Sequence, residues 1–376
     1  MRASSETASP IFAIPSRADN DNWLPTPAIS AEVLEGTFWQ LSFLGSSLIA
    51  PFVVLAPGGY VGNYNHPTAE MWQVVNGSLY FVGSDGLPTA NFNAALNEDG
   101  KLVALAGRGT IGGVQGLYML TVTEHPPHPL YATSKDVPRR AHFLSAPSAT
   151  RPNLVIVPAG KNSLHFEWLR DMKPTNRNWD LCVGWYGKEE PELSVSPEYL
   201  AHIPATKKFR ILYDVLYEGS PLWNYQNIWF PDDDLLTDGQ SINRMFHIFS
   251  KYGLDLAQPS LREGEGSYPN HPVTVQRPGS ILRYEKFVEI MCPIFSMRAL
   301  KICFETMRDT ESGYGLDYLW PAFLGSPPNR MGIIDAVSVD HTRPIGATYS
   351  VQSAVVEQSH IFRTYGFTYA KIAGVK

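Results

Sequence analysis

The chain has 376 residues, of which 44% are hydrophobic and 18% charged, with a formal net charge of −6; this is an ordinary globular balance with material for two domains. The acidic charge and the lack of a long Lys/Arg stripe argue against nucleic-acid binding, and no apolar run has the length of a signal peptide or membrane span. Three cysteines without metal-ligand spacing fit a reducing compartment, so we expect a cytoplasmic protein. From its charge we expect that it binds no nucleic acid.

Residues 1–30 are rich in Ser, Pro, Asn and Asp, and we expect them to be disordered. From residue 31 to about 130, short apolar runs alternate with turn signals, among them Asn76-Gly77, which is typical of a two-residue hairpin. This pattern predicts a small antiparallel β-sandwich or barrel. Its role, glycan binding or oligomerisation as a homodimer, stays open on the sequence alone.

Three side chains of this β-domain are candidates for a glycan-binding face: His66, Glu70 and Trp72. The competing interpretation is that they pack within the domain, and we favour it about two to one. Residues 131–152, rich in Pro, Ser and Ala, are predicted to be a linker.

A different pattern follows the linker. Strands that alternate with amphipathic helices predict an α/β domain over residues 153–349, with largely parallel strands buried on both faces. Such sheets bind ligands at the carboxyl ends of their strands. The expected strands lie at 154–160, 181–187, 227–230, 287–295 and 332–339, and the expected helices at 209–216, 242–249 and 300–307.

The last segment, residues 350–376, mixes aromatic with basic side chains. We expect it to be an extension packed on the body of the domain. The less favoured alternative is a peripheral contact with a membrane, which an amphipathic segment of this composition also permits.

Three consecutive aspartates follow the strand at 227–230. Along an extended backbone alternate side chains point the same way, so Asp232 and Asp234 are expected to face one site while Asp233 turns aside. Oxygen ligands select a hard divalent cation, Mn²⁺ or Mg²⁺. On this stretch alone the alternative, that the aspartates cap the following helix, has even odds.

Other polar residues stand in apolar surroundings. Asp317, between glycines and aromatic residues, is a candidate general base, and its alternative role is helix capping. His341 and Arg343 follow the strand at 332–339, where they are candidates for a metal ligand and a phosphate clamp. Taken alone, a strand-end histidine is more often a satisfied hydrogen-bonding group.

Two further segments carry candidate ligand-binding residues. Lys207 and Lys208 open the helix at 209–216 and could reach phosphate, although solvated surface lysines are more common. The long loop at 261–287 is typical of a functional lid. His271, Arg277 and Arg283 of this loop are candidates for contact with an acceptor, although solvated loop charges are the favoured interpretation.

Six segments together resemble a family of otherwise undescribed proteins of plants and bacteria, labelled only as a domain of unknown function. They lie between residues 152 and 349, about half of the chain: NWDLCVGWYG, IWFPDDDL, LDLAQPSL, FVEIMCPIFS, GYGLDYLWP and IIDAVSVDHTRPIG. That family is similar in layout to glycosyltransferases of the GT-A fold. The β-domain lies outside the resemblance.

The resemblance implies a metal-dependent glycosyltransferase that takes a nucleotide-sugar donor and a glycan or lipid-linked glycan acceptor. It places Mn²⁺ or Mg²⁺ on Asp232, Asp234 and His341, and it makes Asp317 the base for the acceptor hydroxyl. The remaining assignments are to substrate binding: Glu289 at the donor sugar, Asp180 at the nucleoside, and Asp233, Lys207, Lys208 and Arg343. The donor segment FVEIM departs from the family pattern because it lacks the glycines often seen there.

Two other functions remain open. A metal-dependent hydrolase or nucleotidyltransferase would turn over a phosphate substrate without any acceptor. A non-catalytic carbohydrate-binding protein on a degenerate glycosyltransferase scaffold would bind glycan whether or not Asp232 or Asp234 is changed. The order of Asp-x-Asp, then the acidic Asp317, then His341 along the chain favours the transferase.

Overall fold

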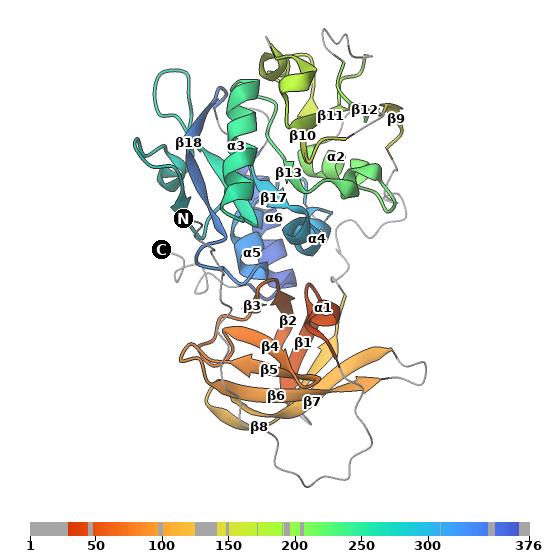
Figure 1. Ribbon diagram of the computed structural model, residues 1–376, viewed down its shortest axis with the longest axis vertical. Helices are drawn as coiled ribbons and strands as arrows, with labels where there is room; N and C mark the ends of the chain where they lie inside the picture. The colour runs from red at the N-terminus through yellow and green to blue at the C-terminus, as the bar shows by residue number, and fades with distance from the viewer. Residues whose placement is uncertain are drawn as a thin grey trace, which may run out of the picture. The chain divides into compact units, whose positions relative to one another are not determined.

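The computed structural model describes residues 29–43, 48–96, 101–124, 141–147, 150–170, 172–189, 191, 196–203, 207–308, 310–344 and 350–367. The chain forms two compact units, Met1–Glu124 and His125–Lys376 (Figure 1), and each is described by itself. The disorder expected for residues 1–30 concerns a segment of which 1–28 lie outside the described residues.

The first unit is a closed, antiparallel barrel in which β1 pairs with both β2 and β8. The sequence left sandwich and barrel open, and the structure has the barrel. Asn76 and Gly77 both have positive φ, 51° and 76°, and form the predicted hairpin turn. After the short α1 (Ala31–Leu34) come β1 (Phe38–Phe43), β2 (Leu48–Ala56), β3 (Tyr60–Gly62), β4 (Met71–Val75), β5 (Ser78–Val82), β6 (Pro88–Leu96), β7 (Leu102–Ile111) and β8 (Val114–Val122).

For Trp72 the structure supports packing within the domain, the interpretation favoured above, rather than a glycan-binding face. Trp72 is only 4% exposed, belongs to the barrel core, and donates its indole N–H to the carbonyl of Ala56 at 2.9 Å. His66 is half-buried and contacts Thr68 through Nδ1 at 2.9 Å, whereas Glu70 is exposed. An indole that fills the core cannot share a binding surface with an exposed carboxylate.

The second unit is built on one mixed sheet with the strand order β14-β18-β15-β17-β13-β10-β11-β12-β9. Its strands are β9 (Phe143–Ser145), β10 (Asn153–Ala159), β11 (Trp179–Trp185), β12 (Tyr199–His202), β13 (Asn227–Trp229), β14 (Leu235–Leu236), β15 (Leu256–Leu261), β16 (Arg283–Tyr284, paired with β18), β17 (Ile294–Ser296) and β18 (Met331–His341). Its helices are η1 (Glu167–Leu169), η2 (Pro174–Asn176), α2 (Lys208–Val215), η3 (Pro221–Asn224), α3 (Gly239–Lys251), η4 (Pro272–Thr274), α4 (Met297–Cys303), η5 (Phe304–Met307), α5 (Leu316–Phe323) and α6 (Val351–Thr364).

Three expectations about this sheet need correction. The strands β10, β11, β12 and β13 are parallel, but β17 is antiparallel to β13 and β15, so the sheet is mixed rather than largely parallel. The expected strand at 287–295 starts only at Ile294. Within the described part of the predicted linker, Phe143–Ser145 forms strand β9 on β12.

Helices cover both faces of the sheet, as the buried strands predict. Ile242, Met245 and Phe246 of α3 join the core on the face that carries Leu181 and Val183. On the opposite face, a Cβ at Gly184 would meet Ile211 of α2 at 2.3 Å, so α2 packs there directly against the backbone of β11. The sheet is therefore buried between helical layers, and its strand ends are the places open to a ligand.

The sequence marks the helix ends well. Asp238 accepts the backbone N–H groups of Gln240 and Ser241 at 2.9 Å and caps α3, which stops just before Gly253 with φ +61°. Ser296 caps α4 in the same way, accepting the N–H of Ala299 at 3.2 Å.

Helix α6 packs on the second unit through Phe362, which contacts Tyr318 of α5 edge to face at 6.4 Å. Tyr365 follows the helix and contacts Phe323 at 5.3 Å. The residues after 367, which carry the remaining aromatic and basic side chains of the tail, lie outside the described residues. None of the helices in the described part of the chain has both the length and the apolar character needed to cross a bilayer.

Candidate active site

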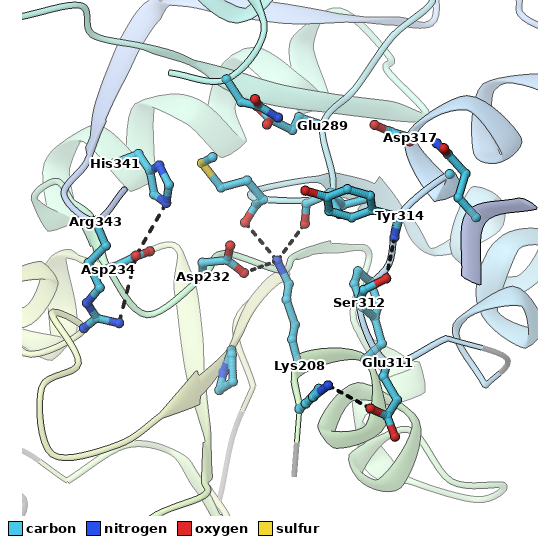
Figure 2. A pocket seen from close by; sticks show the side chains of 18 of the residues that line it. Lys208, Asp232, Asp234, Glu289, Glu311, Ser312, Tyr314, Asp317, His341 and Arg343 are labelled. Atoms are coloured by element: carbon cyan, nitrogen blue, oxygen red, sulfur yellow. Dashed lines mark hydrogen bonds and ion pairs between the residues drawn. The ribbon is translucent and has the colours of Figure 1, made fainter. Parts of the chain in front are cut away.

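A pocket of about 580 Å³ opens where β13 ends (Figure 2). Its walls come from segments far apart in the chain: the aspartates after β13, the start of α2, the loop before β17, the turn before α5, the end of β18, and α6. It is lined by nine of the ten predicted site residues: Lys207, Lys208, Asp232, Asp233, Asp234, Glu289, Asp317, His341 and Arg343.

The three aspartates do not follow the expected strand alternation. The backbone of each is held by a different segment: the N–H of Asp232 donates to the carbonyl of Met291 at 2.9 Å, the carbonyl of Asp233 accepts from Leu164 at 2.7 Å, and that of Asp234 accepts from Thr342 at 3.1 Å. Because β13 ends at Trp229, nothing keeps these residues in a regular strand. Each carboxylate consequently meets its own partner.

Asp232 is paired with Lys208. The ammonium group lies 2.7 Å from Asp232 Oδ1 and donates as well to the carbonyls of Ile290 and Met291 at 2.7 and 2.8 Å. The lysine side chain is 11% exposed and that of the aspartate 37%, so the ammonium is the more buried partner, and Figure 2 shows it directed at Asp232.

Asp234 faces His341, with Oδ2 at 3.4 Å from Nε2. Their meeting follows from the antiparallel pairing of β14 with β18, which sets Leu235 opposite His341. The imidazole Nδ1 lies 2.9 Å from the carbonyl of Tyr268, a position that requires an N–H at Nδ1 and leaves Nε2 directed at the carboxylate. Burial lowers the pKa of His341, but Asp234 and the Tyr268 carbonyl raise it by more, so that the net pKa lies above the usual value.

Asp233 is not turned aside. Its Oδ2 accepts a hydrogen bond from the Tyr186 hydroxyl at 2.6 Å, and its Oδ1 accepts from Arg343 at 2.8 Å. The guanidinium of Arg343 also donates to the carbonyl of Asn162 at 2.7 Å and lies 3.9 Å from Asp234. In this structure Arg343 therefore holds the aspartates, rather than standing open to a phosphate.

Lys207 spans to the other side of the pocket and pairs with Glu311 at 2.8 Å, both side chains being about half exposed. The turn that carries Glu311 is itself tied to α6, because the Glu357 carboxylate accepts from the N–H of Ser312 at 3.0 Å and from its hydroxyl. The C-terminal helix thus fixes the segment that leads into Asp317.

Asp317 lies in the first turn of α5, across the pocket from Asp234 and His341 (Figure 2). Gly315 precedes it with φ +94°, a conformation that lets the chain enter the helix with this carboxyl group turned inward. The residue is 7% exposed, and burial raises the pKa of Asp317 to about 7, although the backbone N–H of Tyr318 opposes the rise. A carboxyl group that titrates near neutral pH is suited to act as a general base.

Glu289 is the second pocket carboxyl group with a strongly raised pKa. It is 3% exposed, its Oε1 lies 3.9 Å from His271, and its Oε2 is buried without a hydrogen-bond partner among the described residues. Burial, reinforced by the negative charge of Asp317, raises the pKa of Glu289 to about 8. At neutral pH this group carries a proton that it can donate to a ligand oxygen.

Asp180 is the predicted site residue that the structure does not bring to the pocket. It lies at the start of β11, in register with Leu154, and is fully buried. Its carboxylate pairs with Arg151 and accepts from the Tyr225 hydroxyl at 2.6 Å. Since the pocket lies past the opposite ends of the strands, we do not include Asp180 in the site.

Sequence reasoning missed three pocket features: the Tyr186 hydroxyl, the Glu311 partner of Lys207, and α6 as a wall. Tyr186 follows β11 directly, so the carboxyl-edge argument used for the aspartates would have found it. Nothing local to α6 marks it, because its role depends on tertiary packing. The loop residue Arg283, a candidate for acceptor contact, is instead buried against Asp335 at 2.6 Å.

The pocket has more acid than base. Its lining carries six carboxyl groups, those of Asp232, Asp233, Asp234, Glu289, Glu311 and Asp317, against the three cations Lys207, Lys208 and Arg343. Asp234 Oδ1 is buried and has no hydrogen-bond partner among the described residues. Carboxylate oxygens are the ligands that a hard divalent cation prefers, and this unpartnered oxygen belongs to the carboxylate that lies beside the imidazole of His341.

Of the three predicted metal ligands, the structure brings Asp234 and His341 together. Asp232 contributes one oxygen to the Lys208 contact and is not gathered with them. Within the described residues, no group of three or more His, Cys, Asp or Glu side chains is arranged to hold a metal ion. The predicted three-residue ligand set is thus present in the pocket lining but not assembled around one point.

Residues 220–363, less than half of the chain, match the model of a family described as "Protein of unknown function (DUF707)". No curated protein matches. Among solved structures, the chain is similar to S. aureus TarS 1–349 in complex with UDP-GlcNAc, with 13% identity, 57% of this chain and 70% of that chain covered, and a TM-score of 0.36. For the complex of the same protein with UDP the identity is 11%, 58% of this chain and 73% of that chain are covered, and the TM-score is 0.35.

Proposed function

We propose that the pocket binds a nucleotide-sugar and transfers its sugar to a hydroxyl group of a glycan acceptor, with the help of Mn²⁺ or Mg²⁺. The observation that carries the proposal is the division of the pocket into two acidic parts. One part, Asp232 to Asp234 with His341, has more carboxylate than its cations neutralise. The other, Asp317 with Glu289, holds carboxyl groups that titrate near neutral pH.

The excess of carboxylate supports a cation in the first part. A diphosphate brought next to three aspartates would be repelled by them at short range, and Lys208 and Arg343 are each already paired with one of these aspartates. Asp234 and His341 would hold the cation, with Asp232 joining them. When bound, the cation supplies positive charge that stabilises a leaving nucleoside diphosphate.

The second part supports proton transfer. In the proposed step Asp317 takes the proton of the acceptor hydroxyl while the acceptor oxygen forms its bond to the anomeric carbon. The bond between that carbon and the diphosphate oxygen breaks, and the nucleoside diphosphate leaves with the electron pair. Protonated Glu289 would donate a hydrogen bond to the sugar. The net result is sugar transfer with inversion at the anomeric carbon.

The first test is a thermal shift assay with a panel of nucleoside diphosphates and nucleotide-sugars, each measured with Mn²⁺ and with EDTA. A metal-dependent rise in Tm for one nucleotide is the expected result, and Asp234→Ala should abolish it. Asp180→Asn, in the same sheet but away from the pocket, should leave the ligand-induced rise intact.

A response to glycans alone, unaffected by metal and by Asp234→Ala, would contradict the transferase and support the carbohydrate-binding alternative. Release of free sugar from the donor at the same rate with and without an acceptor would support the hydrolase alternative. These outcomes separate the three functions because only transfer requires metal, donor and acceptor together.

A further inference from the structure

Lys208 makes an unusually complete set of contacts for a side chain on a pocket wall. An ammonium group has three N–H donors, and three oxygens lie within 2.8 Å of it: Asp232 Oδ1 and the carbonyls of Ile290 and Met291. The aromatic ring of Phe209 lies 5.7 Å away. One carboxylate and two carbonyl oxygens around one positive charge form a cation site, and in this structure the cation is the lysine.

This arrangement conflicts with the use of Asp232 as a metal ligand. A divalent cation bound by Asp232 would lie close to a positive charge in a partly buried wall, where Coulomb interactions are only partly screened. Asp234 is held less closely, since Arg343 contacts Asp233 at 2.8 Å and stands 3.9 Å from Asp234. Before any substrate arrives, the pocket therefore offers a metal two ligands rather than three.

We propose that Lys208 is an internal counter-ion that withholds Asp232 from the metal until a diphosphate binds. The inference rests on the proposed function and deepens it by setting an order of binding. A diphosphate is the one substrate group that can replace Asp232 as a charged partner of the ammonium. Lysine suits such an exchange, because its four-carbon stem is flexible and its donors carry no fixed geometry.

Two consequences follow from this exchange. The metal binds weakly to the substrate-free protein and tightly to the nucleotide complex, so the protein avoids holding a metal ion in an unproductive pocket. Because linkage is reciprocal, the metal must strengthen nucleotide binding by the same factor. Glu289 lies just before Ile290 in the chain. A shift of Lys208 away from the Ile290 and Met291 carbonyls would therefore also change the surroundings of Glu289, in the second part of the pocket.

The experiment measures binding of Mn²⁺ alone by electron paramagnetic resonance, in wild type and in Lys208→Met. Removing the ammonium frees Asp232, so the variant is expected to bind Mn²⁺ about tenfold or more tightly than wild type. The double variant K208M/D232N should return to the wild-type affinity, because it lacks the charged carboxylate that the first change released. Lys208→Arg keeps the charge and should bind Mn²⁺ as weakly as wild type.

Calorimetric titration with the nucleoside diphosphate that raises Tm in the panel above completes the design. In EDTA, wild type should bind this nucleotide more tightly than Lys208→Met, since the ammonium is then available to phosphate. If Lys208→Met does not fold, Lys208→Gln takes its place, because its amide still donates to the carbonyls without a charge.

Equal Mn²⁺ affinity in wild type and in both uncharged variants would overturn the role of Lys208. The proposed function would survive that result if nucleotide binding still depended on metal. Failure of every protein to bind Mn²⁺, with or without nucleotide, would refute both.

Discussion

Replacing the candidate base should stabilise the protein at pH 8. Burial raises the pKa of Asp317 from 3.8 to about 7, so the folded state holds a proton that the unfolded chain releases. Between about pH 4 and pH 7 unfolding therefore liberates a proton, and stability falls as the pH rises through this window. Asn has no proton to lose and still accepts the N–H of Tyr318, which lies 3.1 Å from Asp317 Oδ1. Asp317→Asn should remove this fall in stability with rising pH.

The size of the effect follows from the shift in pKa. About three units at 1.36 kcal/mol each give at most about 4 kcal/mol at pH 8, and less than about 1 kcal/mol at pH 4, where the folded group is protonated and the unfolded one about half so. For a domain of this size each kcal/mol corresponds to roughly 2–4 °C in Tm, so Asp317→Asn should melt several degrees above wild type at pH 8. Sugar transfer should be lost in the same variant.

The assay is calorimetric melting of wild type and Asp317→Asn at several pH values between 4 and 8. Asp238→Asn is the matched control. Burial raises the pKa of this exposed helix cap, but its hydrogen bonds with Ser241 and Gln240 together lower the pKa by more, so its replacement should cost stability at pH 8. Equal Tm differences for Asp317→Asn at pH 4 and pH 8 would refute the argument, because a packing effect has no reason to follow the titration.

Three other predictions concern the titration of the pocket, the buried pair of Arg283 with Asp335, and the contacts of α6. Transfer activity should rise through about pH 7 as Asp317 loses its proton and fall above about pH 8 as Glu289 does, and Glu289→Gln should remove the fall in the pH–rate profile. Arg283→Met leaves Asp335 buried and unpaired and should cost about 3–5 kcal/mol in the free energy of unfolding by urea, with Lys286→Met as the exposed control. Glu357→Gln weakens the contacts of α6 with the turn before α5, so KM for the acceptor should rise while the donor Kd stays the same.

Much of the fold of both units could be predicted, because many of their elements carry strong local signals. The apolar strands at 154–160 and 181–187, the cap at Asp238 and the turn at Asn76-Gly77 each depend on a few neighbouring residues. The direction of β17 does not depend on neighbouring residues in the sequence. A short apolar run has the same pattern in a parallel and an antiparallel strand, so the direction is set by the strands that β17 pairs with.

The candidate site shows the same difference between features set by local sequence and features set by tertiary contacts. The sequence named nine residues that line the pocket, because the carboxyl edge of a sheet and polar residues in apolar runs are visible locally. It could not assign the partners of Asp232, Asp233 and Asp234, because strand alternation ends at Trp229 and three distant segments fix the backbone beyond it. Which cation meets which carboxylate is decided by chain segments that lie from 24 to 110 residues away.

The pairing of these charges determines how a ligand can bind. Lys207, Lys208 and Arg343 each contact a pocket carboxylate, so a phosphate that binds one of them competes with that carboxylate for the positive charge. An anionic ligand that enters alone would leave the released aspartates facing each other without a counter-charge, at a cost that rises with their burial. A divalent cation removes this cost, because it takes up the released carboxylates and the phosphate oxygens together. The ion pairs of the substrate-free pocket are therefore the physical reason to expect that donor and metal bind as one cooperative unit.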